Sequence, residues 1–154
     1  MTDVRTMSLD DIAARIDAVA AEADDVLRAR ATERADELLR LGEGILETWL
    51  AARDETPTDR EVEGFRLLAL HRQGARGTPS FNACRETCRE LVYYHNLIRL
   101  DPTHPDTARR LRLAAMVTRH LALFIGGKLE VAGLGEFCCS ARPLRQREAG
   151  AETV

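Results

Sequence analysis

The hydrophobic positions in the first part of the chain recur at helical spacing. Between Leu9 and Val26 the apolar residues alternate in steps of three and four, the pattern of an amphipathic helix with a coiled-coil-like seam. Ser8 precedes this pattern as a natural N-cap, and Asp10 and Asp11 lie in the first turn, where the helix dipole favours negative charge. The pattern therefore predicts that a long amphipathic helix begins after Ser8.

The apolar stripe changes phase after Val26 and then continues to Ala52. An unbroken helix from Leu9 to Ala52 would be about 66 Å long at the usual rise per residue. That length exceeds the size of a compact domain of this chain length. Because Gly42 and Gly44 interrupt the second part of the stripe, we expect the helix either to break near Gly42 or to protrude and dimerise.

Start and stop signals predict three further helices, over residues 58–74, 79–100 and 105–125. A capping-box pattern opens the first of them, and a proline at the first helical position opens the second. The third is apolar nearly all round its second half, which is typical of a central helix, and Gly126-Gly127 is expected to stop it.

Composition supports one all-α domain. The chain has 154 residues, enough to bury roughly two-thirds of its unfolded surface in a single core. Aromatic residues make up only 5%, and Ala, Leu and Arg are abundant, which suits helices better than sheets. We predict a helical bundle of four to five helices with a long N-terminal amphipathic helix and a Gly-rich C-terminal segment. Residues 1–7 are expected to be a flexible N-terminus, residues 8–141 the helical domain and residues 142–154 a disordered tail.

No apolar run approaches the ~20 residues that cross a bilayer, and the first residues lack the apolar core of a signal peptide. These features predict a cytoplasmic protein with no membrane partner. In a reducing compartment, clustered cysteines more often serve as metal ligands or redox-active thiols than as structural disulfides.

Charge is distributed unevenly along the chain. Residues 1–63 carry 17 acidic and 8 basic side chains, whereas residues 64–154 carry 8 acidic and 14 basic ones. A surface for nucleic acid, formed by the Arg-rich second half, is one interpretation. We prefer the other, in which the acidic N-terminal helix lies against basic helices of the same chain, of a second copy or of a protein partner. No aromatic-interleaved basic motif or helix-turn-helix accompanies the arginines.

The four cysteines are the strongest indication of chemistry. Cys84 and Cys88 are four residues apart, so their sulfurs project from one side of a helix about one turn apart. Antiparallel packing of the last two predicted helices would bring His120 to the level of this pair. The Gly-rich segment that follows could turn Cys138 or Cys139 back towards Cys84.

The same short turn between these helices also sets a register. It predicts that Cys84 lies beside Leu121 and that Cys88 lies beside Val117.

Three interpretations of the cysteines stay open. A set of three or four drawn from Cys84, Cys88, His120, Cys138 and Cys139 matches the ligands of tetrahedral zinc, and thiolates also bind iron-sulfur clusters. Free cysteines are among the most buried residue types, so Cys84 and Cys88 could instead be small hydrophobic members of the core. The third interpretation is a thiol switch, in which Cys84 or Cys88 exchanges disulfides with Cys138 or Cys139.

A second group of polar-tipped side chains precedes the turn. Tyr94 and His95 could line a pocket for a small molecule or haem, or the hydroxyl groups and the imidazole could satisfy one another at the edge of the core. The sequence has no P-loop, HExxH or GxSxG motif and no paired carboxylates on an apolar stripe. An enzymatic role is therefore unsupported.

The sequence thus predicts an accessory or regulatory helical protein whose Cys/His site binds a metal ion or iron-sulfur cluster, with zinc or iron as the metal, or acts as a thiol redox switch. One alternative is a metal-free helical interaction or assembly protein with its cysteines in the core. The other is a regulator that binds nucleic acid through its Arg-rich half.

Overall fold

The computed structural model of the chain describes Val4 and residues 7–133. Within these residues all regular structure is helical, and the only strand-like pairing is the isolated bridge between Val62 and Phe65. Among the described residues, six α-helices and the short 3-10 helix η2 follow one another. They are α1 (Leu9–Ala20), α2 (Asp24–Ala29), α3 (Ala31–Ala52), α4 (Arg66–Ala75), η2 (Pro79–Cys84), α5 (Arg85–Leu100) and α6 (Thr107–Ala132). The predicted all-α bundle is confirmed, with slightly more helices than expected.

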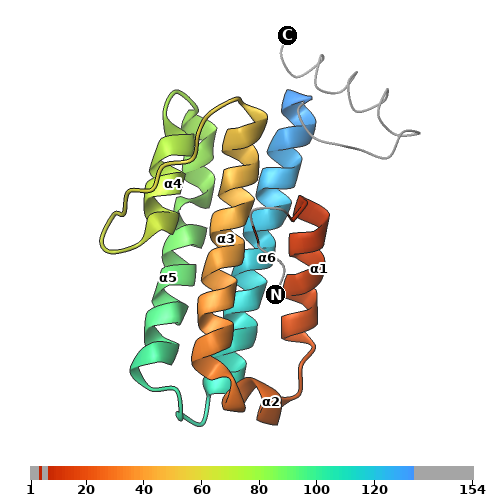
Figure 1. The fold of residues 1–154 in the computed structure, drawn as a ribbon, viewed down its shortest axis with the longest axis vertical. Coiled ribbons are helices and arrows are strands. Elements are labelled where there is room, and N and C mark those ends of the chain that lie inside the picture. The colour runs from red at the N-terminus through yellow and green to blue at the C-terminus, as the bar shows by residue number, and fades with distance from the viewer. Residues whose placement is uncertain (1–3, 5–6, 134–154) are drawn as a thin grey trace, which may run out of the picture.

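The bundle is organised around α6 (Figure 1). This helix packs against α1, α3 and α5, and α3 also packs against α4 and α5. The short α4 lies beside the ends of α3 and α5, on the far side of the bundle from α1. The prediction that the helix after residue 105 is central is therefore correct, because its apolar surface is shared among three neighbours.

The first helix begins as the sequence predicted but ends much earlier. The Ser8 hydroxyl accepts a hydrogen bond from the Asp11 N–H, and the Asp11 carboxylate accepts one from the Ser8 N–H, completing a capping box. The chain then leaves the helical path after Ala20 and again at Arg30. The phase change near Val26 marks this double break, and the expectation of a break near Gly42 was wrong.

Gly42 and Gly44 lie inside α3 because neighbouring elements approach the helix closely there. A Cβ atom added to Gly42 would lie 2.8 Å from Cδ2 of Leu91 and 3.3 Å from Cδ1 of Leu67. The glycine thus lets α4 and α5 pack directly onto the α3 backbone, an advantage that outweighs its low helix propensity.

Two other predicted helix ends were also wrong. The capping-box pattern near residue 58 does not open a helix: the Thr58 hydroxyl accepts a hydrogen bond from the Arg60 N–H within a loop, and α4 begins only at Arg66. At the other end, α6 continues through Gly126-Gly127 to Ala132, and Gly133 ends it in the left-handed conformation with φ of 68°.

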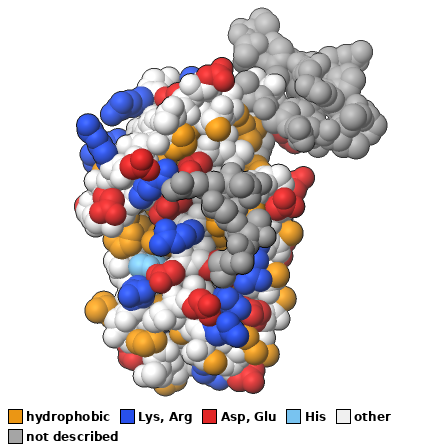
Figure 2. Space-filling model, viewed as in Figure 1, with side chains coloured by type: hydrophobic (Ala, Val, Ile, Leu, Met, Phe, Trp, Pro, Cys, Tyr) orange, Lys and Arg blue, Asp and Glu red, His pale blue; other side chains and the backbone are white. Residues whose placement is uncertain are grey.

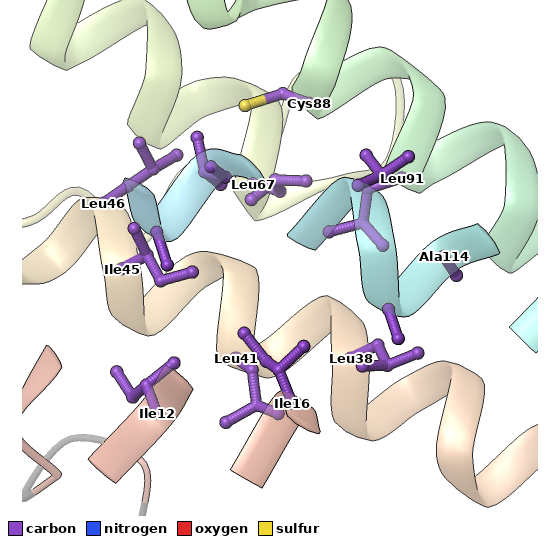
Figure 3. Close-up of a cluster of buried hydrophobic side chains, with 14 of the residues drawn as sticks. Ile12, Ile16, Leu38, Leu41, Ile45, Leu46, Leu67, Cys88, Leu91 and Ala114 are labelled. Atoms are coloured by element: carbon purple, nitrogen blue, oxygen red, sulfur yellow. The ribbon is translucent and has the colours of Figure 1, made fainter. Parts of the chain in front are cut away.

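The core is continuous through the bundle (Figure 3). Side chains from α1, α3, α4, α5 and α6 meet in it, including Ile16, Leu41, Leu67, Leu91 and Leu121, each no more than 1% exposed. Cys88 lies at the edge of the same cluster, near Leu67. The two thiols predicted as a site are therefore part of the packed interior.

Ion pairs within the chain neutralise much of the charge asymmetry. Arg112 and Arg119 of α6 pair with Asp24 and Asp17, at 2.6 and 3.4 Å. On the face shown in Figure 2, positive and negative side chains are interspersed along much of the bundle. The acidic N-terminal helices thus lie against basic helices of the same chain.

In the part of the chain that the structure describes, no helix is both long enough and apolar enough to cross a membrane.

Two helical glycines give opposite predictions for stability. A Cβ at Gly74 would lie 2.7 and 2.9 Å from ring atoms of Phe81, whereas a Cβ at Gly127 would meet nothing within 4 Å. We expect Gly74→Ala to lower the free energy of unfolding by about 1–3 kcal/mol, because the ring must move. Gly127→Ala should raise it by up to about 1 kcal/mol through helix propensity. Urea denaturation of both variants tests this, and a Gly74→Ala protein as stable as the parent would contradict the packing described.

Candidate functional site

The site is a buried pair of thiols where η2 meets α5. Cys84 is the last residue of η2 and immediately precedes α5, and Cys88 lies in the first turns of α5. Cys84 is 1% exposed and Cys88 is fully buried. The two thiols are close enough for each to shift the pKa of the other. The helix spacing predicted from the sequence therefore does bring these two cysteines together.

A histidine from another helix completes the cluster. His71 of α4 is 6% exposed, and its Nε2 lies 3.0 Å from the Phe81 carbonyl oxygen. The Cys84 thiol donates to the same oxygen at 3.2 Å, and His71 and Cys84 shift each other's pKa. One carbonyl group thus holds the thiol and the imidazole side by side.

Aromatic packing fixes the position of that carbonyl. The Phe81 ring is fully buried and stacks on His71 and Trp49, with centroid distances of 5.4 and 5.7 Å. Phe124 of α6 meets it edge-on at 6.0 Å, and Gly74 leaves room for it. Because rings from three helices enclose Phe81, its side chain anchors η2 to the core.

The electrostatics of the two thiols differ strongly. The hydrogen bond from Cys88, together with the hydrogen bond and charge of His71, lowers the pKa of Cys84 to about 6 against the effect of burial. The start of α5 adds the positive end of a helix dipole, which favours a thiolate. The neighbouring Cys84 and burial raise the pKa of Cys88 well above its usual range.

Burial alone would lower the pKa of His71, but the hydrogen bonds to Cys84 and to the Phe81 carbonyl outweigh it, so the pKa of His71 is raised. The raised pKa of His71 and the lowered pKa of Cys84 have a common cause, because their contact favours a protonated imidazole beside a thiolate. Chemically, such a pair supplies a nucleophilic sulfur with a second thiol in reach.

His120 does not lie at this site, although near Phe81 the two segments meet at the level that the turn predicts. Phe81 meets Phe124, and Lys128 donates a 2.6 Å hydrogen bond to Ser80, so α5 and α6 run antiparallel at the expected level. His120, however, is exposed on α6, whereas Leu121 beside it is buried. Turn length predicts the level of a residue on the helix, but the side of the helix that it occupies depends on helix rotation.

Cys138 and Cys139 lie outside the described residues. Within the described ones, no group of three or more Cys, His, Asp or Glu side chains is arranged to hold a metal ion. The sequence analysis did not identify His71. This histidine reaches Cys84 because of the way α4 packs, and the spacing of residues along the chain carries no signal of that packing.

The second predicted group forms an ion-pair network. His95 is 8% exposed, and its Nε2 lies 2.8 Å from an Asp36 carboxylate oxygen, which Arg99 also binds at 3.1 Å. Phe65 packs edge-on to the imidazole, and Tyr94 is half-buried against Tyr93. These contacts tie α5 to α3.

No protein-family model matches this chain, and comparisons with curated proteins and with solved structures found no significant match. The fold and the site together define a small helical bundle with a buried, electrostatically unequal dithiol.

The contacts that lower the pKa of Cys84 predict how far each variant should move the pH midpoint of its alkylation. The alkylation rate of Cys84 should rise with pH through a midpoint near 6, because only the thiolate reacts. Cys88→Ala should move this midpoint upward most, since it removes the largest stabilising contact, and His71→Phe should move it upward less. The exposed His120 provides the control variant His120→Gln, which should leave the midpoint unchanged.

The measurement is mass spectrometry of the Cys84 peptide after timed iodoacetamide treatment across pH. A midpoint that stays in place in both Cys88→Ala and His71→Phe would show that neither side chain tunes this thiol.

Proposed function

We propose that the protein is a thiol redox switch in which Cys84 and Cys88 interconvert between a dithiol and a disulfide. The single observation that carries the proposal is the contact of two thiols with opposite pKa shifts beside His71. One thiol is suited to attack at neutral pH, and the other stays protonated until it is needed.

The reaction with a small disulfide has two steps. The Cys84 thiolate attacks one sulfur of the reagent, so a mixed disulfide forms on Cys84 and one small thiolate leaves and takes up a proton. Cys88 then loses its proton and attacks the Cys84 sulfur, which releases the second small thiol. The two cysteines lose two electrons and the Cys88 proton; the reagent gains both electrons, and its second proton comes from water. His71 is placed to exchange a proton with Cys84.

Access to the sulfur requires η2 to open locally, because Cys84 is only 1% exposed. The segment is suited to this: η2 is a six-residue 3-10 helix, longer than such helices usually are, and its hydrogen-bond geometry is weaker than that of an α-helix. Pro79 at its first turn donates no backbone hydrogen bond.

Oxidation would alter the surroundings of Phe81. Cys84 contacts both the Phe81 carbonyl and His71, and a disulfide to Cys88 would alter both contacts. The redox state is thereby linked to the packing of α4 and η2 on the core, which is how a buried dithiol can act as a signal. A regulatory role in a reducing compartment such as the cytoplasm follows from this proposal.

The alternative function is a helical interaction or assembly protein whose cysteines only fill the core. The observation that favours it is the near-complete burial of both thiols within the continuous hydrophobic cluster.

Peptide mapping after mild oxidation separates these functions. Trypsin cuts after Arg85, so Cys84 and Cys88 fall on different peptides, residues 77–85 and 86–89. Under native conditions, hydroxyethyl disulfide should link these two peptides to each other. Cys88→Ser should stop at a hydroxyethyl adduct on Cys84, and Cys84→Ser should show no link.

The opposite results are equally distinct. Thiols that react only after denaturation would support the core function. A link from Cys84 to the peptide that carries Cys138 and Cys139 would replace the proposed pairing with exchange between the two cysteine pairs.

A further inference from the structure

A pocket of about 260 Å³ adjoins the dithiol on the side of His71. It lies between α4, the start of α5 and the loop before α4, and His71 forms part of its wall. The buried imidazole therefore separates the Cys84 thiol from the space of the pocket.

The polar wall of the pocket is cationic. Arg72, Arg85 and Arg89 line it together with the side chain of Asn82. Arg89 pairs with Glu63 at 3.0 Å, whereas the side chains of Arg72 and Arg85 form no hydrogen bond or ion pair with any residue that the structure describes. Two unpaired guanidinium groups at one small pocket leave a concentrated positive field, which favours an anion.

Val62, Leu68 and Ala75 also line the pocket and give the apolar wall. A bare inorganic ion would make no use of this apolar surface. The volume is slightly below the range of pockets for drug-sized molecules, so it fits a small ligand. Guanidinium groups bind carboxylate and phosphate oxygens in pairs, and the apolar wall accommodates a hydrocarbon body.

We propose that this pocket binds a small organic anion, with a phosphate or carboxylate group held by Arg72 and Arg85 and an apolar body against Val62 and Leu68. Binding of the anion does not require the dithiol to be redox-active, so this proposal is independent of the proposed redox switch. On the face shown in Figure 2, positive side chains also gather at the end of the bundle near α4.

Calorimetric titration with four probes tests the proposal. Phenyl phosphate and benzoate carry both features, inorganic phosphate lacks the apolar body, and benzyl alcohol lacks the charge. We expect at least one of the first two to bind about tenfold or more tightly than inorganic phosphate and than benzyl alcohol. Whichever of phenyl phosphate and benzoate binds better identifies the anionic group.

Variants locate the site. The double substitution Arg72→Gln, Arg85→Gln should weaken the better probe by about tenfold or more, because charged hydrogen bonds are lost. Arg109 is exposed on α6 and does not line the pocket, so Arg109→Gln should bind as the parent does. Cys84→Ser should also retain binding, which separates failure of this proposal from failure of the redox switch.

The contrary results are clear. Absence of saturation by phenyl phosphate and benzoate at millimolar concentrations would overturn the proposal. Unchanged affinity in the double arginine variant would do so as well. Equal affinity for inorganic phosphate or for benzyl alcohol would overturn the assignment to an organic anion.

Discussion

The packing of Phe81 is the constraint on which both the fold and the candidate site depend. Its ring lies between Trp49, His71 and Phe124, which come from α3, α4 and α6, and Gly74 leaves the space that the ring fills. Its carbonyl group holds the Cys84 thiol and the His71 imidazole. One residue thus joins three helices through its side chain and positions the reactive groups through its backbone.

This arrangement explains how a thiol can be buried and yet strongly polarised. Burial by itself disfavours a thiolate. Hydrogen bonds and a nearby positive charge nevertheless stabilise the thiolate more strongly where little water screens them. Cys84 receives such contacts from Cys88 and His71, whereas Cys88 faces the negative charge of Cys84. Two identical side chains one helical turn apart therefore acquire opposite properties from their surroundings.

Much of the fold could be predicted from local patterns. The all-α class, the Ser8 cap, the central position of α6 and the antiparallel level of Phe81 and Phe124 all follow from hydrophobic period and turn length. Errors arose where tertiary packing overrides propensity. Gly42 reads as a helix breaker, but it lies within a helix because Leu91 approaches its backbone.

For the candidate site, as for the fold, only the features that follow from local patterns could be predicted from the sequence. The Cys84 and Cys88 contact follows from helix geometry alone. The side of α6 that His120 occupies, and the arrival of His71 from α4, depend on helix rotation and on packing between distant segments. Neither leaves a periodic trace in one sequence, so the partner histidine could be identified only from the structure.

The position of Arg112 has a consequence for synthesis on the ribosome. Its guanidinium group binds the carbonyl oxygens of Ala20 and Glu22 and the carboxylate of Asp24, so it holds the bend between α1 and α2 from a position 92 residues after Ala20. At roughly 5–20 residues per second, the N-terminal helices wait several seconds for this contact. The apolar face of α1 therefore cannot pack against α6 until most of the protein has been made. The bundle can complete its core only late in synthesis.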